Sequence, residues 1–165
     1  AVSALLPHRP TIQDIANLEV SYSPPYASAM DIVNSAANAL ENTMDGLHVP
    51  NDAAAFTSAF IADPSTRVLD VRSRVQSKPF VDTFGDRWQN IPQEELTSRL
   101  DEVNGKGPLW LICGSGPRSY EAQLVLRHHG IDDTQNVQGG IKMVMLSDPK
   151  FIEMVTENST EKQEG

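Results

Sequence analysis

Cysteine is almost missing from this sequence: Cys113 is the only one among 165 residues, so the chain cannot form an internal disulfide. A fold held together by disulfides is therefore excluded, and a reducing, cytoplasmic location is the expectation. Lysine and arginine are also scarce, at 13 against 22 aspartates and glutamates, which gives a net charge of -9. Such a surface repels phosphate backbones and anionic lipids, so we expect binding neither to nucleic acid nor to membrane surfaces.

Long apolar runs are missing as well. The longest apolar runs in the sequence are far shorter than the roughly 18 residues that a membrane-spanning helix needs. Residues 1–9 also lack the basic-then-apolar order of a secretory signal. What is present is a globular composition, with 39% hydrophobic and 21% charged residues. The length suits one domain, or one domain plus part of another.

The first part of the chain differs from the rest. Ser28 or Asp31 is suited to cap a helix that Gly46 would end. The apolar positions of this helix share one face, and nothing nearby in the sequence can cover that face. We therefore interpret residues 1–46 as a piece of a larger domain and residues 47–52 as a linker.

Strand and helix patterns alternate from residue 53 onward. The predicted strands are 68–71, 109–112 and 136–138, the predicted helices are 53–62, 92–103 and 119–129, and residues 73–90 are expected to be mostly loop. This alternation predicts an α/β fold with a parallel sheet over residues 53–150. Residues 151–165 are expected to form a C-terminal tail.

Cys113 lies where a predicted buried strand ends and a helix begins. Ligands bind at this end of the strands in open α/β sheets. Gly114 and Gly116 allow the backbone to turn so that several amides face one point. The following helix directs free N–H groups at the loop, and Arg118 adds a positive charge. Such settings lower the pKa of a cysteine from about 8.5 to roughly 3.5–7.5. The sequence therefore predicts a nucleophilic thiolate held by backbone amides.

The same loop has two other interpretations. A lone cysteine is usually inert packing, but the flanking glycines and arginine favour a chemical role. Gly114, Gly116 and Ser119 also fall at the spacing of a dinucleotide-binding GxGxxG loop. Ser119 replaces the third glycine, and little chain remains for such a fold, so this alternative is disfavoured.

Four motifs in order resemble those of the rhodanese-like sulfurtransferases. Their active loop, Cys-x-x-Gly-x-Arg-Ser, matches Cys113, Gly116, Arg118 and Ser119. The other three are Val-Leu-Asp-Val-Arg at 68–72, Asn-Ile-Pro with Glu-Leu and Arg-Leu over 90–100, and Gly-Gly-Ile at 139–141. The resemblance covers about residues 53–147. It implies a central, mostly parallel sheet of about five strands flanked by helices.

The resemblance also implies a reaction. Cys113, assisted by Arg118, would carry sulfane sulfur as a persulfide and pass it to a thiol, without a cofactor or a metal. The residues expected to bind the persulfide or substrate are Gly114, Ser115, Gly116, Pro117, Ser119, Asp70 and Arg72. Four residues separate Cys113 from Arg118, a loop size that suits sulfur, whereas phosphatase relatives have one residue more. The alternative is a non-catalytic rhodanese-like module for binding or assembly, although inactive members usually lack the cysteine.

Residues 21–34 resemble the end of the dimerisation domain of FAD- and NAD(P)H-dependent disulfide reductases. In coenzyme A-disulfide reductases and NADH-dependent persulfide reductases, a rhodanese domain follows this segment directly. The resemblance implies the C-terminal part of a fused reductase or a truncated relative, with FAD, NAD(P)H and coenzyme A implied only for the full-length enzyme. Tyr22 matches a tyrosine that reaches the partner subunit's active-site cysteine. The expected partners are a sulfane-sulfur donor, a thiol acceptor, a flavoprotein reductase domain and a second copy bound through residues 1–46.

Overall fold

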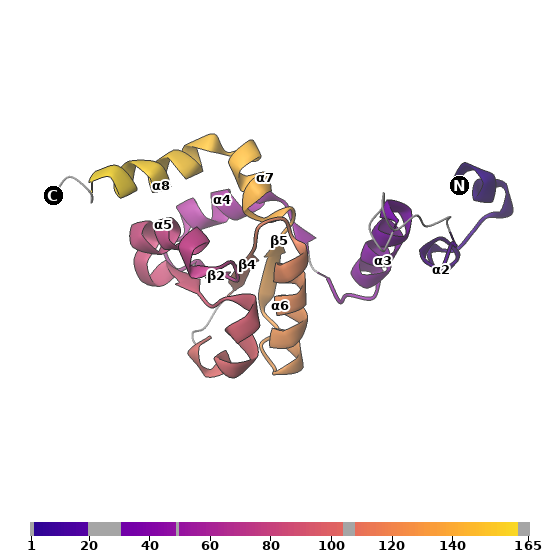
Figure 1. Ribbon diagram of the computed structural model, residues 1–165, viewed down its shortest axis with the longest axis horizontal. Coiled ribbons are helices and arrows are strands. Elements are labelled where there is room, and N and C mark those ends of the chain that lie inside the picture. Colours follow the sequence, from indigo (N-terminus) through magenta and orange to yellow (C-terminus); the bar gives the residue numbers. More distant parts are fainter. Residues whose placement is uncertain (1, 20–30, 49, 104–107, 162–165) are drawn as a thin grey trace. The chain divides into compact units, whose positions relative to one another are not determined.

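The chain forms two compact units, Ala1–His48 and Val49–Gly165, in a computed structural model (Figure 1). The structure describes residues 2–19, 31–48, 50–103 and 108–161. None of the helices in these ranges is long and apolar enough to cross a membrane.

The described residues of the first unit form helices. They are α1 (Val2–Leu5), η1 (Leu6–His8), α2 (Ile12–Ala16) and α3 (Ile32–Met44). Asp31 caps α3 by accepting a hydrogen bond from the N–H of Val33 at 2.8 Å. Asn34 then joins α3 to α2, because its amide nitrogen donates to the carbonyl oxygens of Ala16 and Leu18, at 2.9 Å each. The other cap considered from the sequence, Ser28, lies outside the described residues.

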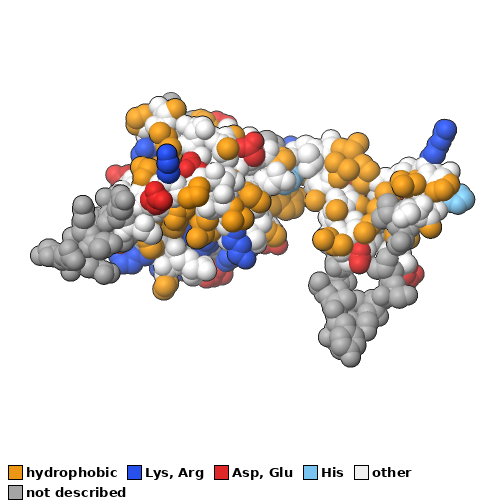
Figure 2. Space-filling view, turned by 90° about the horizontal axis from the view of Figure 1, so that it is seen from above, with side chains coloured by type: hydrophobic (Ala, Val, Ile, Leu, Met, Phe, Trp, Pro, Cys, Tyr) orange, Lys and Arg blue, Asp and Glu red, His pale blue; other side chains and the backbone are white. Residues whose placement is uncertain are grey.

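One face of α3 carries exposed apolar side chains. Ile32, Leu40 and Met44 are exposed, whereas Ala37 is buried. Hydrophobic side chains are plainly visible on the surface of this unit in Figure 2. The interpretation of residues 1–46 as part of a dimerisation domain stays a prediction.

A parallel sheet forms the centre of the second unit. In the described part of the chain its five strands are β1 (Pro50–Asn51), β2 (Arg67–Asp70), β3 (Trp88–Asn90), β4 (Leu109–Ile112) and β5 (Thr134–Val137). Their order is β1-β5-β4-β2-β3, and every neighbouring pair is parallel. The predicted fold class, a parallel α/β sheet of about five strands flanked by helices, is confirmed.

Helices cover both faces of this sheet (Figure 1). They are α4 (Ala53–Ala62), α5 (Arg74–Phe84), η2 (Gly85–Arg87), η3 (Gln93–Ser98), η4 (Leu100–Glu102), α6 (Pro117–His128), α7 (Gly140–Ser147) and α8 (Pro149–Glu161). Side chains alternate between the two faces along a strand. Val68, Trp110 and Ile112 therefore pack into an aromatic-rich core with α4, α5, α7 and α8. Leu69 and Leu111 pack into a second core with α6 and η3.

The segment 73–90, expected to be mostly loop, instead forms α5, η2 and β3. Pro79 lies inside α5 and would ordinarily disfavour a helix there. Packing overrides this local signal, because Phe80 is buried and stacks on Trp88 with ring centroids 4.9 Å apart. The helix expected at 92–103 is also different, since this region forms the two 3-10 helices η3 and η4.

Both ends of the predicted domain differ from the sequence expectation. The segment 47–52, expected to be a linker, contains β1, which pairs with β5 through Pro50–Asn136 and Asn51–Val137. A two-residue strand is too short to give a periodic pattern. The segment 151–165, expected to be a tail, contributes to α8. Phe151 of this helix is 1% exposed and belongs to the aromatic-rich core.

Candidate active site

Cys113 directly follows β4, which lies between β5 and β2 in the sheet. The chain then turns sharply into α6. Gly116 is the residue before α6, and its φ of 112° lies in the region that glycine adopts far more readily than other residues. Pro117 occupies the first position of α6, where its missing N–H costs no helical hydrogen bond. The loop thus returns over the end of its own strand.

The Cys113 thiol is buried inside this loop. The residue is 1% exposed, and the N–H of Gly116 donates to its Sγ at 3.0 Å. The Oγ of Ser119, which is fully buried, lies 3.4 Å from the same sulfur and 2.9 Å from the carbonyl oxygen of Gly116. A hydroxyl has one hydrogen, so Ser119 donates to one of these acceptors at a time.

The surroundings favour the thiolate. Burial raises the pKa of the Cys113 thiol, but hydrogen bonds from Ser119, Ser115 and Gly116 outweigh burial. The pKa therefore lies below the ordinary value of a cysteine. Because the thiolate is the nucleophilic form, this cysteine is suited to attack a substrate.

The remaining residues of the loop are more exposed than Cys113 and Ser119. Ser115, Pro117 and Arg118 are exposed, and Gly114 is half-buried. A Cβ on Gly114 would lie 3.4 Å from Nη2 of Arg118, so the guanidinium group lies beside the loop backbone. Of the predicted loop residues, the structure thus brings Ser115, Gly116 and Ser119 to the Cys113 sulfur, and a role of Gly114, Pro117 and Arg118 in binding stays a prediction.

Gly140 brings a second segment against this loop. The N–H of Ile141 donates to the carbonyl oxygen of Cys113 at 2.8 Å, and the N–H of Lys142 donates to that of Gly114 at 3.3 Å. The sequence motif Gly-Gly-Ile pointed to this segment without assigning it a place in the site. Only the strand order, which sets β5 beside β4, shows why the segment that follows β5 meets the loop that follows β4.

Asp70 and Arg72 form a buried pair of their own. Nη2 of Arg72 lies 2.5 Å from Oδ2 of Asp70, and the indole N–H of Trp88 donates to the same oxygen at 3.1 Å. The Arg72 guanidinium also lies 4.7 Å from the centre of the Phe80 ring. Trp88 and Phe80 belong to the aromatic-rich core, whereas Cys113 packs in the other core. A direct role of this pair in binding substrate stays a prediction.

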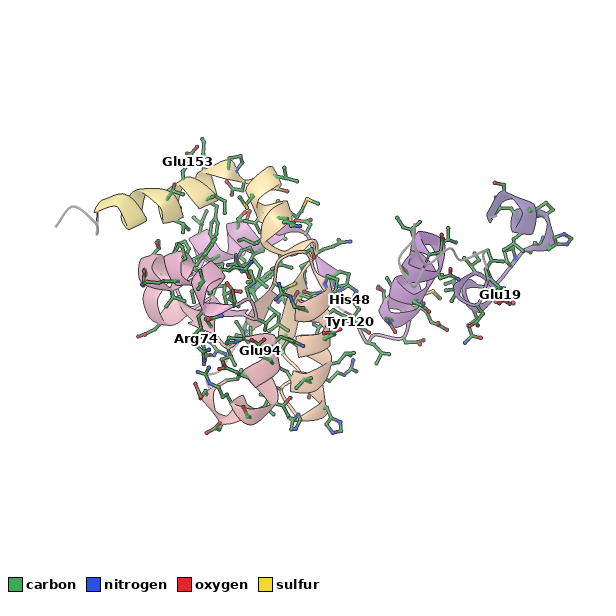
Figure 3. All side chains as sticks on the ribbon, viewed as in Figure 1. Glu19, His48, Arg74, Glu94, Tyr120 and Glu153 are labelled. Atoms are coloured by element: carbon green, nitrogen blue, oxygen red, sulfur yellow. The ribbon has the colours of Figure 1, made fainter. Side chains whose placement is uncertain are left out.

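Of Tyr22 and Tyr120, the structure describes only the second. Tyr22, which resembles a reductase tyrosine, lies outside the described residues. Tyr120 follows Ser119 in the first turn of α6, where Figure 3 labels it, and burial raises its pKa. In the ranges that the structure describes, no group of three or more His, Cys, Asp or Glu side chains could hold a metal ion.

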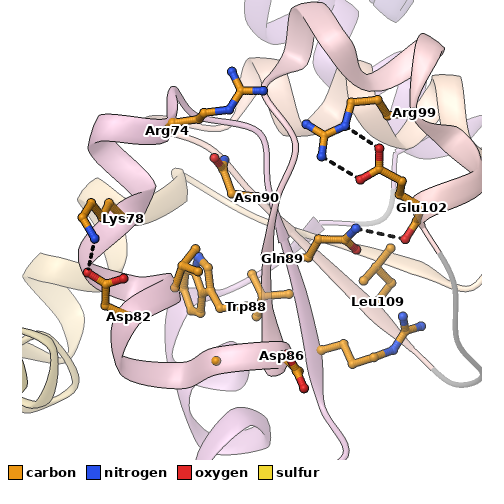
Figure 4. A pocket seen from close by; sticks show the side chains of 14 residues that line it. Arg74, Lys78, Asp82, Asp86, Trp88, Gln89, Asn90, Arg99, Glu102 and Leu109 are labelled. Atoms are coloured by element: carbon orange, nitrogen blue, oxygen red, sulfur yellow. Dashed lines mark hydrogen bonds and ion pairs between the residues drawn. The ribbon is translucent and has the colours of Figure 1, made fainter.

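A cavity of about 700 Å³ lies along the edge strand β3 (Figure 4). Its lining includes Arg67 and Leu109, which begin β2 and β4, whereas Cys113 follows the opposite end of β4. Charged groups of the lining pair with each other, as Lys78 does with Asp82 at 2.6 Å. Because its lining includes the amino ends of β2 and β4, this cavity is separate from the thiol.

A second cavity, of about 630 Å³, lies closer to the loop. Its lining residues are Asp52, Ala53, Ala54, Gln138, Gly139, Met143 and Ser147. Asp52 and Gln138 directly follow β1 and β5, so this cavity lies at the carboxyl edge of the sheet, as Cys113 does. Gly139 also borders the loop, because a Cβ on Gly116 would lie 3.5 Å from the Gly139 nitrogen.

Comparison with known proteins adds to this geometry. No protein-family model matches the chain. The uncharacterized protein YqhL of Bacillus subtilis (strain 168) is 35% identical over 54 residues, which are 33% of this chain and 43% of that protein.

Solved structures give longer matches. Reduced CoADR-RHD from Bacillus anthracis is 30% identical with a TM-score of 0.76, over 90% of this chain and 26% of that one. A NAD-dependent persulfide reductase from A. fulgidus is 31% identical with a TM-score of 0.66, over 85% and 24%. A rhodanese-related protein from Thermoplasma volcanium is 25% identical with a TM-score of 0.51, over 61% and 94%.

These likenesses concern a domain within larger proteins. The chain spans about a quarter of the length of the two reductases and less than half of YqhL. Its structural neighbours are the rhodanese-like part of CoA-disulfide and persulfide reductases, together with separate rhodanese-like proteins. The resemblance and the rhodanese-like fold expected from the sequence are therefore confirmed.

Proposed function

We propose that this chain, with its rhodanese-like fold, is a sulfurtransferase domain that carries sulfane sulfur on Cys113. The observation that carries the proposal is the thiol itself. It lies at the carboxyl edge of the sheet, its pKa is lowered, and the N–H of Gly116 donates to its Sγ at 3.0 Å. A buried cysteine that merely filled space would need none of these donors.

The proposed first step is a nucleophilic displacement on sulfur. The Cys113 thiolate attacks the outer sulfur of a sulfane donor, an S–S bond forms, and the old S–S bond breaks. The electron pair of the broken bond leaves with the rest of the donor, as a thiolate from a persulfide or as sulfite from thiosulfate, so no external oxidant or reductant takes part. Cys113 is left as a persulfide, whose negative charge lies on the outer sulfur.

The second step regenerates the thiolate. An acceptor thiolate attacks the outer sulfur of the persulfide, and Cys113 leaves with the electron pair. Backbone amides between Gly114 and Ser119 are suited to hold the charge of the persulfide between the two steps, as an oxyanion hole holds an oxyanion. Arg118, beside the loop mouth, adds an attraction for anionic donors and acceptors.

The acceptor that we propose is a thiol or the active-site cysteine of a flavoprotein reductase. Two of the structural neighbours are reductases, and the chain matches about a quarter of each. FAD, NAD(P)H and coenzyme A would belong to such a reductase, and the transfer step on Cys113 needs no cofactor. The single cysteine of the chain is in keeping with a cytoplasmic location.

Measurement of the intact mass tests this function. The protein is incubated with thiosulfate or with a glutathione persulfide, beside Cys113→Ser as the control. We expect one added sulfur atom on the wild type, none on the variant, and removal of the sulfur by cyanide. Failure to take up sulfur from any donor would refute a stand-alone sulfurtransferase and favour the non-catalytic module. Hydrolysis of phosphate esters by the same protein would favour the phosphatase reading of the loop.

A further inference from the structure

The amino end of α7 binds two consecutive peptide groups of the Cys113 loop. Ile141 and Lys142 donate their N–H groups to the carbonyl oxygens of Cys113 and Gly114, at 2.8 and 3.3 Å. First-turn amides have no acceptor within their own helix, so a helix start must find acceptors elsewhere. The loop carbonyls serve as these acceptors.

This contact decides which way the loop amides point. The described peptide bonds are all trans. In a trans peptide the C=O and the N–H point in opposite directions. A Cys113 carbonyl held toward α7 therefore turns the N–H of Gly114 away from α7, and a Gly114 carbonyl held there turns away the N–H of Ser115. The Ser115 amide is one of the groups that lower the pKa of Cys113.

Only glycine fits where α7 meets the loop. Gly140 has a φ of 58°, and a Cβ built on it would lie 2.8 Å from the nitrogen of Ser115 and 2.9 Å from the carbonyl carbon of Gly114. A Cβ does not approach non-bonded backbone atoms as closely as this. The atoms in the way belong to the loop backbone, so they cannot rotate aside as the end of a long side chain can. Any side chain here must push α7 and the loop apart.

We propose that Gly140 is a positioning residue for sulfur transfer. By lacking a side chain, it lets α7 bind the carbonyls of Cys113 and Gly114, and this contact aims the loop amides at the sulfur. Gly140 acts through the loop backbone and does not touch the sulfur. The inference rests on the proposed function and extends its machinery to a segment that the loop motif does not contain.

Gly140→Ala tests the proposal, and Gly85→Ala is its matched control. Gly85 has a φ of 59°, against 58° for Gly140, but a Cβ on Gly85 meets nothing within 4 Å. The two variants therefore share a positive φ that alanine adopts poorly, and only one of them presses on the loop. The readout is the rate of alkylation of Cys113 by iodoacetamide across a range of pH, on samples whose circular dichroism matches that of the wild type.

We expect Gly140→Ala to move this profile to higher pH. Loss of a hydrogen bond to a charged sulfur should slow alkylation about tenfold at pH values below the wild-type pKa. Gly85→Ala should follow the wild-type profile. A wild-type profile for folded Gly140→Ala would overturn the proposal, and so would an equal change in both variants.

Hydrogen exchange of the wild-type protein is a second test, which does not depend on whether Gly140→Ala folds. The amides of Ile141 and Lys142 should exchange more slowly than those of an unstructured peptide, because the loop carbonyls bind them. Exchange at the unstructured rate would overturn the proposal. Neither test uses a sulfur donor. Suppose that the wild type takes up no sulfur while Gly140→Ala still shifts the alkylation profile and the Ile141 and Lys142 amides still exchange slowly. That result would refute the proposed function but not the role of Gly140 in positioning the loop.

Discussion

Ser119→Ala offers the most direct test of how this loop activates its thiol. The Ser119 hydroxyl lies 3.4 Å from Sγ of Cys113 and is fully buried, so water cannot easily replace it. A hydrogen bond to a charged group contributes roughly 1.5–3 kcal/mol. Ser119 also lies 2.9 Å from the carbonyl oxygen of Gly116, and this sharing reduces what the sulfur receives. We therefore expect the thiolate to lose about 1–1.5 kcal/mol, which corresponds to a five- to tenfold change in its ionisation equilibrium.

The sign of this effect is fixed. Removal of a donor to the charged form raises the pKa of Cys113, so alkylation by iodoacetamide should slow about five- to tenfold at pH values below the wild-type pKa. The two alkylation rates should converge at high pH, where Cys113 is a thiolate in both proteins. Ser115→Ala is the control, because Ser115 contributes its backbone amide, which alanine retains, and its side chain is exposed. A Ser119→Ala profile that coincides with the wild type, or that moves to lower pH, would refute this account.

The pKa of Cys113 should also affect stability. Burial raises this pKa, but hydrogen bonds lower it by more, so the folded protein binds fewer protons than the unfolded one between the two pKa values. The stability of the wild type relative to Cys113→Ser should therefore rise with pH through this window, and urea unfolding that shows a constant difference would contradict it. Arg72→Ala should cost about 3–5 kcal/mol in urea unfolding, because the carboxylate of Asp70 stays buried without its partner. Phe56→Ala should cost about 3–5 kcal/mol through the cavity it leaves in the aromatic-rich core, whereas the exposed Glu94→Ala should stay within about 0.5 kcal/mol.

The sequence was most informative where local signals and packing agree. The apolar run at 109–112 predicted β4 with its observed ends, and residues 53–62 predicted α4, which Asp52 caps by accepting from the N–H of Ala55. The turn chemistry around Gly116 located the start of α6 to within two residues. These elements are specified by neighbours in the chain, which sequence patterns can report.

Elements that depend on distant contacts were missed. Pro79 argued against a helix at 74–84, yet Phe80 and the Trp88 ring hold α5 against the sheet. Phe151 made α8 part of the core, although its segment was expected to be a tail. β1 exists only because β5 offers it a partner. For α8 and β1 the stabilising contact comes from residues far along the chain, and for α5 it comes from packing against β3, so no local pattern contains that information.

The candidate site also combines contacts from neighbouring residues with contacts from a distant segment of the chain. The groups that act on the sulfur come from one continuous stretch, since the donors to Cys113 are Ser115, Gly116 and Ser119. The support of that stretch comes from another, because the amides of Ile141 and Lys142 reach it only after the chain has passed through α6 and β5. A motif can therefore mark a reactive cysteine while leaving its pKa undetermined. Two proteins with the same Cys-x-x-Gly-x-Arg-Ser loop should differ in thiol pKa when the segment after the neighbouring strand approaches the loop differently.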